Sequence, residues 1–177
     1  MPTRVGQRRR RKSRTIRRMR RTKEIVIHET IPVRRDLEPI IRECRFVFPL
    51  EKGGYWISSP FGPRRKKDGT TSFHYGIDIA APYGTPVRSV AHGVVVEASR
   101  MRGFGLTVVV SHGKVKTRYA HLSRIDVEVG ETVEAKQRIG RVGNSGNTRG
   151  KNGVHLHLEV ILYGKRVPPH QFFAELH

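Results

Sequence analysis

The stretch from Gly153 to Val160, GVHLHLEV, places two histidines one residue apart. Its apolar residues alternate with His155, His157 and Glu159, and strict alternation is typical of a half-buried β-strand. All three polar side chains therefore leave the same face of the predicted strand. Two parallel imidazoles roughly 6 to 7 Å apart are too distant to satisfy each other by a direct hydrogen bond. They could bind a metal, act in acid–base catalysis or simply face solvent.

Two other segments carry residues suited to the same chemistry. In FHYGIDIAAPYG, His74 precedes Asp78 by four positions, and the nearby glycines favour a turn into a strand over a helix. In TRYAHLSRI, His121 stands at an expected strand end. A catalytic zinc takes about three nitrogen or oxygen ligands and keeps one position open for water. His74, Asp78 and one of the two strand histidines supply that set, and the remaining histidines can serve as acid–base groups.

The elements that must position these side chains are short β runs divided by turns. With no convincing long amphipathic helix, they predict an all-β fold, an antiparallel sandwich or partly open barrel. The single cysteine, Cys44, excludes an intramolecular disulfide and a cysteine-based zinc site. No HExxH motif is present, so histidine would have to replace the glutamate base of that motif. The expected strands lie in GYWISS, TPVRSVAHGVVVEASR, LTVVVSHG, VKTRYAHL, QRIGRVG and GVHLHLEVILYG.

The charge pattern divides the chain into three predicted pieces. Residues 1–23 hold 12 of the 35 Lys and Arg residues and no acid, so they predict a flexible basic tail that adheres to nucleic acid, anionic lipid or an anionic wall polymer. Residues 24–45 form a connecting segment with a short strand, EIVIHETIPV, and a helical turn, DLEPIIREC. Residues 46–177 form the domain. No stretch has the roughly 18 to 20 apolar residues of a membrane span, and no signal peptide is visible.

Several motifs of the domain occur in the order of a known family. They are SSPFGPR, HYGID, AAPYGTPV, GVVVEA, TRYAHLS, VEVGETVEAKQRIGRVGNSG and HLH. Over Phe46 to about Phe173 the chain resembles the LytM/lysostaphin-type zinc metallopeptidases, family M23, in these motifs and their spacing.

The resemblance implies a role for each candidate residue. It makes His74, Asp78 and His157 the ligands of Zn²⁺, and His121 and His155 the two catalytic histidines that do not bind metal. It implies hydrolysis of peptide bonds in bacterial peptidoglycan, at cross-links or stem peptides, with a metal-activated water. One catalytic histidine would take the proton of the water, and the other would stabilise the oxyanion. The expected location is the cell envelope, periplasmic or extracellular.

The chain departs from the family pattern just before the histidine pair. The usual segment is similar to STGPHLHFE, whereas this chain has the longer NTRGKNGVHLHLE, with Val154 and Leu158 at the positions of the proline and the aromatic residue. We expect this difference to affect the shape of the groove and the substrate preference. Two other functions compatible with the sequence are a non-catalytic LytM-like regulator of wall hydrolases and a basic polyanion-binding protein.

The basic tail yields a prediction of its own. Deleting residues 1–23 should abolish binding to polyanions and leave hydrolysis intact, because the tail holds more than half of the excess positive charge. Salt-dependent binding to a polyanion column measures the first effect. Retention of binding by the shortened protein would show that the polyanion site lies elsewhere.

Overall fold

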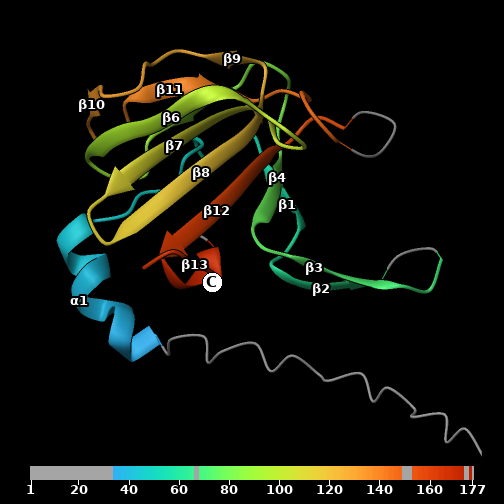
Figure 1. Ribbon diagram of the computed structural model, residues 1–177, viewed down its shortest axis with the longest axis horizontal. Coiled ribbons are helices and arrows are strands. Elements are labelled where there is room, and N and C mark those ends of the chain that lie inside the picture. The colour runs from blue at the N-terminus through green and yellow to red at the C-terminus, as the bar shows by residue number, and fades with distance from the viewer. Residues whose placement is uncertain (1–33, 66–67, 149–152, 174–175, 177) are drawn as a thin grey trace, which may run out of the picture. The chain divides into compact units, whose positions relative to one another are not determined.

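Antiparallel strands are the main secondary structure of the described part of the chain. A computed structural model describes residues 34–65, 68–148, 153–173 and 176, and the all-β antiparallel fold predicted from the sequence is confirmed (Figure 1). The elements are α1 (Arg34–Cys44), β1 (Trp56–Ser59), β2 (Gly62–Arg65), β3 (Thr71–His74), β4 (Ile77–Ala80), β5 (Pro86–Arg88), β6 (Gly93–Met101), β7 (Gly105–His112), β8 (Val115–Leu122), β9 (Arg124–Ile125), β10 (Thr132–Val133), β11 (Arg138–Arg141), β12 (Leu156–Leu162), β13 (Lys165–Val167) and η1 (Pro169–Gln171).

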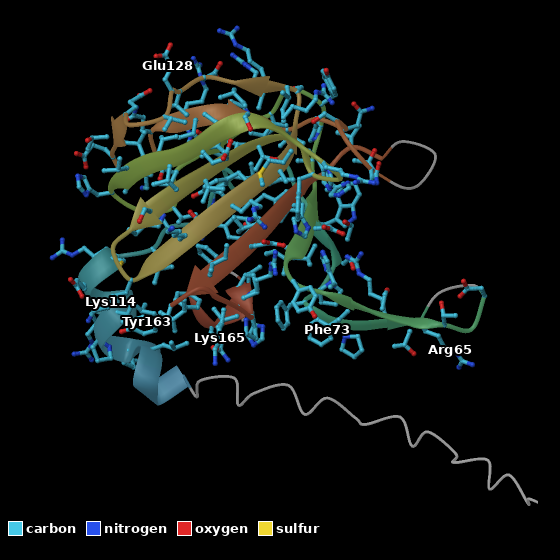
Figure 2. The ribbon with its side chains drawn as sticks, in the orientation of Figure 1. Arg65, Phe73, Lys114, Glu128, Tyr163 and Lys165 are labelled. Atoms are coloured by element: carbon cyan, nitrogen blue, oxygen red, sulfur yellow. The ribbon has the colours of Figure 1, made fainter. Side chains whose placement is uncertain are left out.

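These strands form three sheets. The largest has the order β1-β4-β12-β8-β7-β6-β10, with β13 paired to β12, and β5-β11-β9 form a second sheet. The third is the hairpin of β2 and β3, which reaches away from the large sheet and carries Arg65 and Phe73 (Figures 1 and 2). In Figure 2, Lys114, Tyr163 and Lys165 mark the turns at the opposite end of β12 from the histidine pair.

The hydrophobic core joins the two larger sheets. On β12, Leu156, Leu158 and Val160 are fully buried, as the alternation predicts. They pack with Val87 of β5 and Ile139 of β11 in one cluster. Each buried side chain of this size contributes about 1.5–3 kcal/mol relative to an exposed one. Burial of this inner face fixes the register of β12, because a shift by one residue would turn its apolar side chains to the other face.

The register of β12 places the candidate residues side by side. His157 lies opposite Asp78 of β4 on one side and Ala120 of β8 on the other. His121 follows Ala120, and His74 ends β3 just before β4 begins. Three segments that are distant in the sequence therefore meet at the amino-terminal end of β12.

The amino-terminal predictions fall partly outside the described residues. The basic tail of residues 1–23 and the strand EIVIHETIPV both lie outside them. The helical turn predicted over DLEPIIREC is part of α1, whose Leu37 and Ile40 are buried in the core. No helix in the described ranges is long and apolar enough to cross a bilayer.

Candidate metal centre

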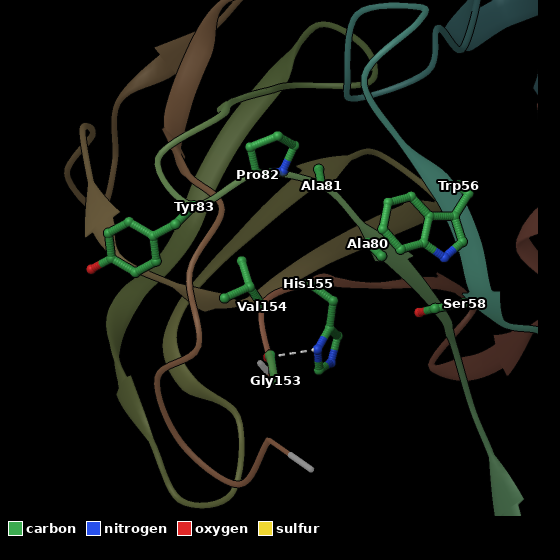
Figure 3. A pocket seen from close by; sticks show the side chains of 9 residues that line it. All are labelled: Trp56, Ser58, Ala80, Ala81, Pro82, Tyr83, Gly153, Val154 and His155. Atoms are coloured by element: carbon green, nitrogen blue, oxygen red, sulfur yellow. Dashed lines mark hydrogen bonds between the residues drawn. The ribbon is translucent and has the colours of Figure 1, made fainter. Parts of the chain in front are cut away.

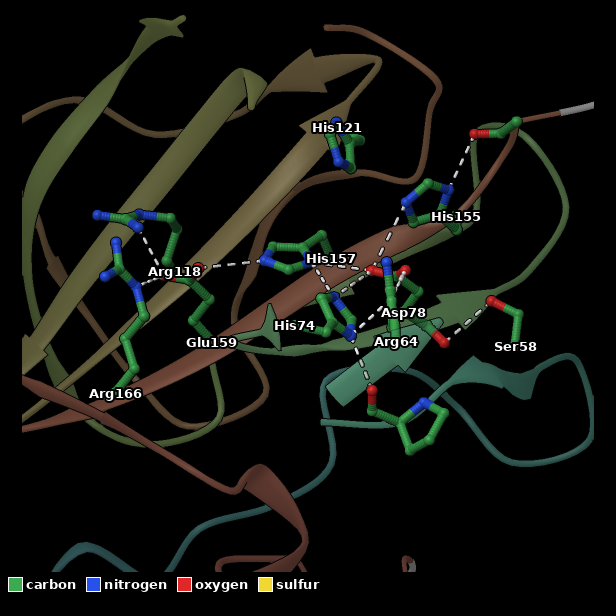
Figure 4. Close-up of polar contacts among 12 residues, drawn as sticks. Ser58, Arg64, His74, Asp78, Arg118, His121, His155, His157, Glu159 and Arg166 are labelled. Atoms are coloured by element: carbon green, nitrogen blue, oxygen red, sulfur yellow. Dashed lines mark hydrogen bonds and ion pairs between the residues drawn. The ribbon is translucent and has the colours of Figure 1, made fainter. Parts of the chain in front are cut away.

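Three side chains converge on one point at the end of β12 (Figure 4). His74 Nε2 lies 3.1 Å from His157 Nδ1 and 3.1 Å from Asp78 Oδ1, and His157 Nδ1 lies 2.8 Å from Asp78 Oδ1. The three residues are almost entirely shielded from solvent, with side-chain exposures of 7%, 8% and 14% for His74, His157 and Asp78. The group therefore has the size and the shielding of a metal-binding site.

The HYGID turn brings this group together. Gly76 lies against the His157 ring, and a Cβ added to Gly76 would come within 2.8 Å of His157 Cε1 and 2.5 Å of the Leu158 carbonyl oxygen. Real Cβ atoms do not approach other atoms so closely. The glycine between His74 and Asp78 thus allows this turn to pack closely against the His157 ring.

Neighbouring groups orient His74 and Asp78. The carbonyl oxygen of Pro60 lies 2.8 Å from His74 Nδ1, on the far side of the ring from Nε2, which is the atom directed at the group. The Arg64 Nη2 atom donates to Asp78 Oδ2 at 2.6 Å, which leaves Oδ1 for the group. The same Nη2 atom also lies 2.6 Å from His74 Nδ1. Burial opposes the charge on Asp78, but hydrogen bonds with His157 and His74 outweigh it and lower the pKa of the Asp78 carboxyl.

A buried carboxylate orients His157. Glu159 Oε1 lies 3.3 Å from His157 Nε2, and Glu159 is only 2% exposed. Its Oε2 atom accepts from Arg118 Nη1 at 2.5 Å and from Arg166 Nε at 3.1 Å. Burial opposes the charge on Glu159, but the His157 hydrogen bond and the two guanidinium groups lower its pKa. Glu159 thus accepts a hydrogen bond from Nε2 and directs Nδ1 of His157 at the group, as carboxylates do for metal-binding histidines.

We expect Glu159→Ala to weaken zinc binding about 10–100-fold, because the His157 ring loses the acceptor that orients it. Glu159→Gln keeps a carbonyl oxygen as acceptor and should recover most of that loss. Competition with a chromogenic chelator measures both affinities, and circular dichroism checks that each variant is folded. A folded Glu159→Ala protein with unchanged zinc affinity would remove this role from Glu159.

His121 and His155 lie on one side of the group without joining it. Their ring centroids are 4.8 Å apart, and His155 Nε2 is 3.7 Å from Asp78 Oδ1. The carbonyl oxygen of Ser145 accepts from His121 Nδ1 at 2.8 Å, and that of Gly153 accepts from His155 Nδ1 at 3.0 Å. Because a carbonyl oxygen only accepts, each neutral ring keeps its lone pair on Nε2.

Burial shifts the pKa of both rings, and one of the two residues has a strained backbone. Burial lowers the pKa of both His121 and His155, which favours the neutral form that can accept a proton. His121 has a φ of 61°, in the left-handed region that few residues other than glycine adopt. A hydrogen bond from its backbone nitrogen to the Phe104 oxygen, 2.8 Å long, holds it there. Strain of this kind is often found at functional sites.

The donor set suits zinc. Zinc in proteins prefers histidine nitrogen and carboxylate oxygen at about 2.0–2.1 Å, so tetrahedral ligand atoms lie about 3.3 Å apart. The separations of 2.8 to 3.1 Å among His74, Asp78 and His157 need to widen by only a few tenths of an ångström. No fourth His, Cys, Asp or Glu side chain joins the group within the described ranges.

The structure brings together all five residues that the sequence singled out. It also adds partners that the sequence reasoning missed, namely Arg64, Arg118 and Arg166. Arg64 lies within the SSPFGPR motif, so the sequence contained a signal that could have pointed to it as a site residue. Arg118 faces Glu159 only through the register of β8 against β12, and alternation within one strand cannot reveal which residue stands opposite.

Fold and site together define an antiparallel β protein of the LytM type with a buried His-Asp-His group that can hold a metal. The model of Peptidase family M23 matches residues 72–169, more than half of the chain. The chain belongs to peptidase family M23.

Relatives and solved structures agree with this membership. The chain is 45% identical over 114 residues to the peptidoglycan DD-endopeptidase ShyA of Vibrio cholerae, covering 63% of this chain and 26% of that protein. It is 42% identical over 129 residues to the DD-carboxypeptidase/endopeptidase Mpg of Neisseria meningitidis, covering 67% of this chain and 29% of that protein.

Two solved structures are similar in fold. A zinc-containing peptidase from Vibrio cholerae has a TM-score of 0.65 and 34% identity, over 73% of this chain and 40% of that one. The catalytic domain of lysostaphin from Staphylococcus simulans has a TM-score of 0.58 and 30% identity, over 67% of this chain and 91% of that one. The match with the curated relatives ShyA and Mpg spans less than a third of their length.

Proposed function

We propose that this protein is a zinc-dependent endopeptidase that hydrolyses peptide bonds in bacterial peptidoglycan. The observation that carries the proposal is the convergence of His74 Nε2, Asp78 Oδ1 and His157 Nδ1 within 2.8 to 3.1 Å of one another. Beside them stand two histidines, His121 and His155, that are held by backbone carbonyl groups and keep Nε2 free. A metal centre flanked by two such imidazoles is equipped for hydrolysis.

These contacts support a role for each residue. His74, Asp78 and His157 would hold the zinc, which when bound polarises a peptide carbonyl and makes water a stronger acid. One of His121 and His155 accepts the proton of the attacking water at Nε2 and delivers it to the leaving amine. The other donates a hydrogen bond to the carbonyl oxygen as negative charge develops there. The hydrogen bonds to Ser145 and Gly153 hold the two rings in place for these steps.

The substrate assignment rests on the relatives. Two proteins that share 42% and 45% identity with this chain are described as a DD-carboxypeptidase/endopeptidase and a peptidoglycan DD-endopeptidase. We therefore place the action of this chain on wall peptides in the bacterial envelope, periplasmic or extracellular.

The direct test is incubation of the purified, zinc-loaded protein with peptidoglycan of several chemotypes, followed by labelling of free amino groups. We expect new amino termini to accumulate, and we expect a chelator to stop their release. A zinc-loaded protein that releases none from any chemotype would instead support the non-catalytic, regulatory alternative.

A further inference from the structure

A pocket of about 530 Å³ opens beside the candidate metal centre. Figure 3 shows Trp56 and Tyr83 on its opposite sides, with Ala80, Val154 and His155 between them. Trp56 and Tyr83 are 65% and 64% exposed. Two large aromatic side chains thus stand largely free of packing at the mouth of a hollow.

The pocket adjoins the metal centre along β4. Asp78 and Ala80 are two residues apart on one strand, so their side chains leave the same face roughly 7 Å apart. Trp56 is paired with Ala80 across β1 and β4, which places the indole next to it. His155 lines the pocket while its Nε2 lies 3.7 Å from Asp78 Oδ1. A peptide held at the metal centre would therefore continue over this pocket.

Among the described residues, no acidic or basic side chain lines the pocket. Asp, Glu, Lys and Arg make up 28% of the chain, yet the nine described residues around the pocket include none of them. On the other side of the metal centre, Glu159 pairs with Arg118 and Arg166, so the two sides differ in character. A charged side chain placed in the pocket would lose part of its hydration and would find no acidic or basic partner among the described lining residues. The rigid aromatic walls instead offer apolar contact area at low entropic cost.

We propose that the pocket between Trp56 and Tyr83 is a specificity subsite. It receives an uncharged, apolar side chain of the wall peptide from a residue within two positions of the scissile bond, and it discriminates against acidic and basic side chains. The assignment deepens the proposed endopeptidase function and rests on it for the identity of the ligand. It also gives a role to Val154, which occupies the position of the usual proline in the family pattern and lines the pocket.

Kinetics on matched peptides test the discrimination. Each alanine within two residues of the cut bond is changed in turn to glutamate, and we expect kcat/KM to fall at least about tenfold at one of these positions. In Trp56→Ala and Tyr83→Ala, we expect KM for the alanine peptide to rise about tenfold with kcat little changed, and the discrimination to shrink. Tyr163→Ala is the matched control, because Tyr163 is 66% exposed and lies at the other end of β12.

Binding can be followed without turnover. Trp56 is the only tryptophan in the chain, so its fluorescence reports on this pocket alone. We expect the alanine peptide to shift the emission of the zinc-loaded His121→Ala protein to shorter wavelength, since His121 does not line the pocket and its loss should make cleavage too slow to interfere. The glutamate peptide and an N-acetylglucosamine oligomer should have little effect.

The outcomes separate this subsite from the proposed function. If the wild type cleaves no wall peptide but the fluorescence shift is observed, the proposed endopeptidase function is refuted and the proposed subsite is still supported. The subsite is overturned if saturating alanine peptide leaves the emission unchanged. It is also overturned if the sugar alone shifts the emission, or if both aromatic variants keep the discrimination of the wild type.

Discussion

We expect His155→Ala to retain zinc and to lose a factor of about 10² to 10⁴ in the rate of peptide hydrolysis. His155 lies outside the group formed by His74, Asp78 and His157, and its Nε2 atom is 3.7 Å from Asp78 Oδ1. Removing the ring should therefore affect a proton transfer and leave the metal in place. Metal content by mass spectrometry and steady-state kinetics on one wall peptide measure the two effects.

His121→Ala provides the companion measurement for His155→Ala. The two rings are neighbours, and both are held through Nδ1 by carbonyl groups. We expect His121→Ala to retain zinc as well and to be similarly slow. His92→Ala is the control, because the His92 side chain is 65% exposed and remote from the group, and it should behave as the wild type.

The second large effect is expected from His157→Ala. In the proposed site His157 would supply one of three ligand atoms, so its loss should weaken zinc binding by more than the roughly 100-fold that removal of an outer partner costs at most. Hydrolysis at limiting zinc should fall with occupancy. Chelator competition gives the affinity, and the Glu159→Gln protein serves as a reference in which the ligand remains but its partner is altered.

The two variants together test which of the strand histidines, His155 or His157, binds the metal. If His155→Ala lost zinc and His157→Ala kept it while losing turnover, the assignment within the pair would be reversed. If both variants kept zinc and full activity, neither histidine would belong to the site.

Much of the fold follows from pattern in the sequence. Alternation in GVHLHLEV predicts β12, and the buried Leu156, Leu158 and Val160 follow it. The other face of β12 is less open than a half-buried strand suggests, because His157 and Glu159 are only 7% and 2% exposed. Arg118 and Arg166 close over Glu159 from neighbouring strands.

The candidate site required more than pattern. Residue chemistry alone leaves open which of His155 and His157 joins His74 and Asp78, and only the family resemblance divides them. Contacts made across strands could not be predicted at all. The pairing of Trp56 with Ala80 depends on how β1 aligns with β4, and nothing local to either segment encodes that register.

The most direct test of the central claim is mass spectrometry of the products from defined peptidoglycan fragments, treated with zinc-loaded protein in ¹⁸O-labelled water. The proposed function predicts cleavage at one peptide bond, with ¹⁸O in the new carboxylate, in wild type and not in His155→Ala or His157→Ala at limiting zinc. Intact fragments after incubation with the zinc-loaded wild type, or equal cleavage by all three proteins, would contradict it.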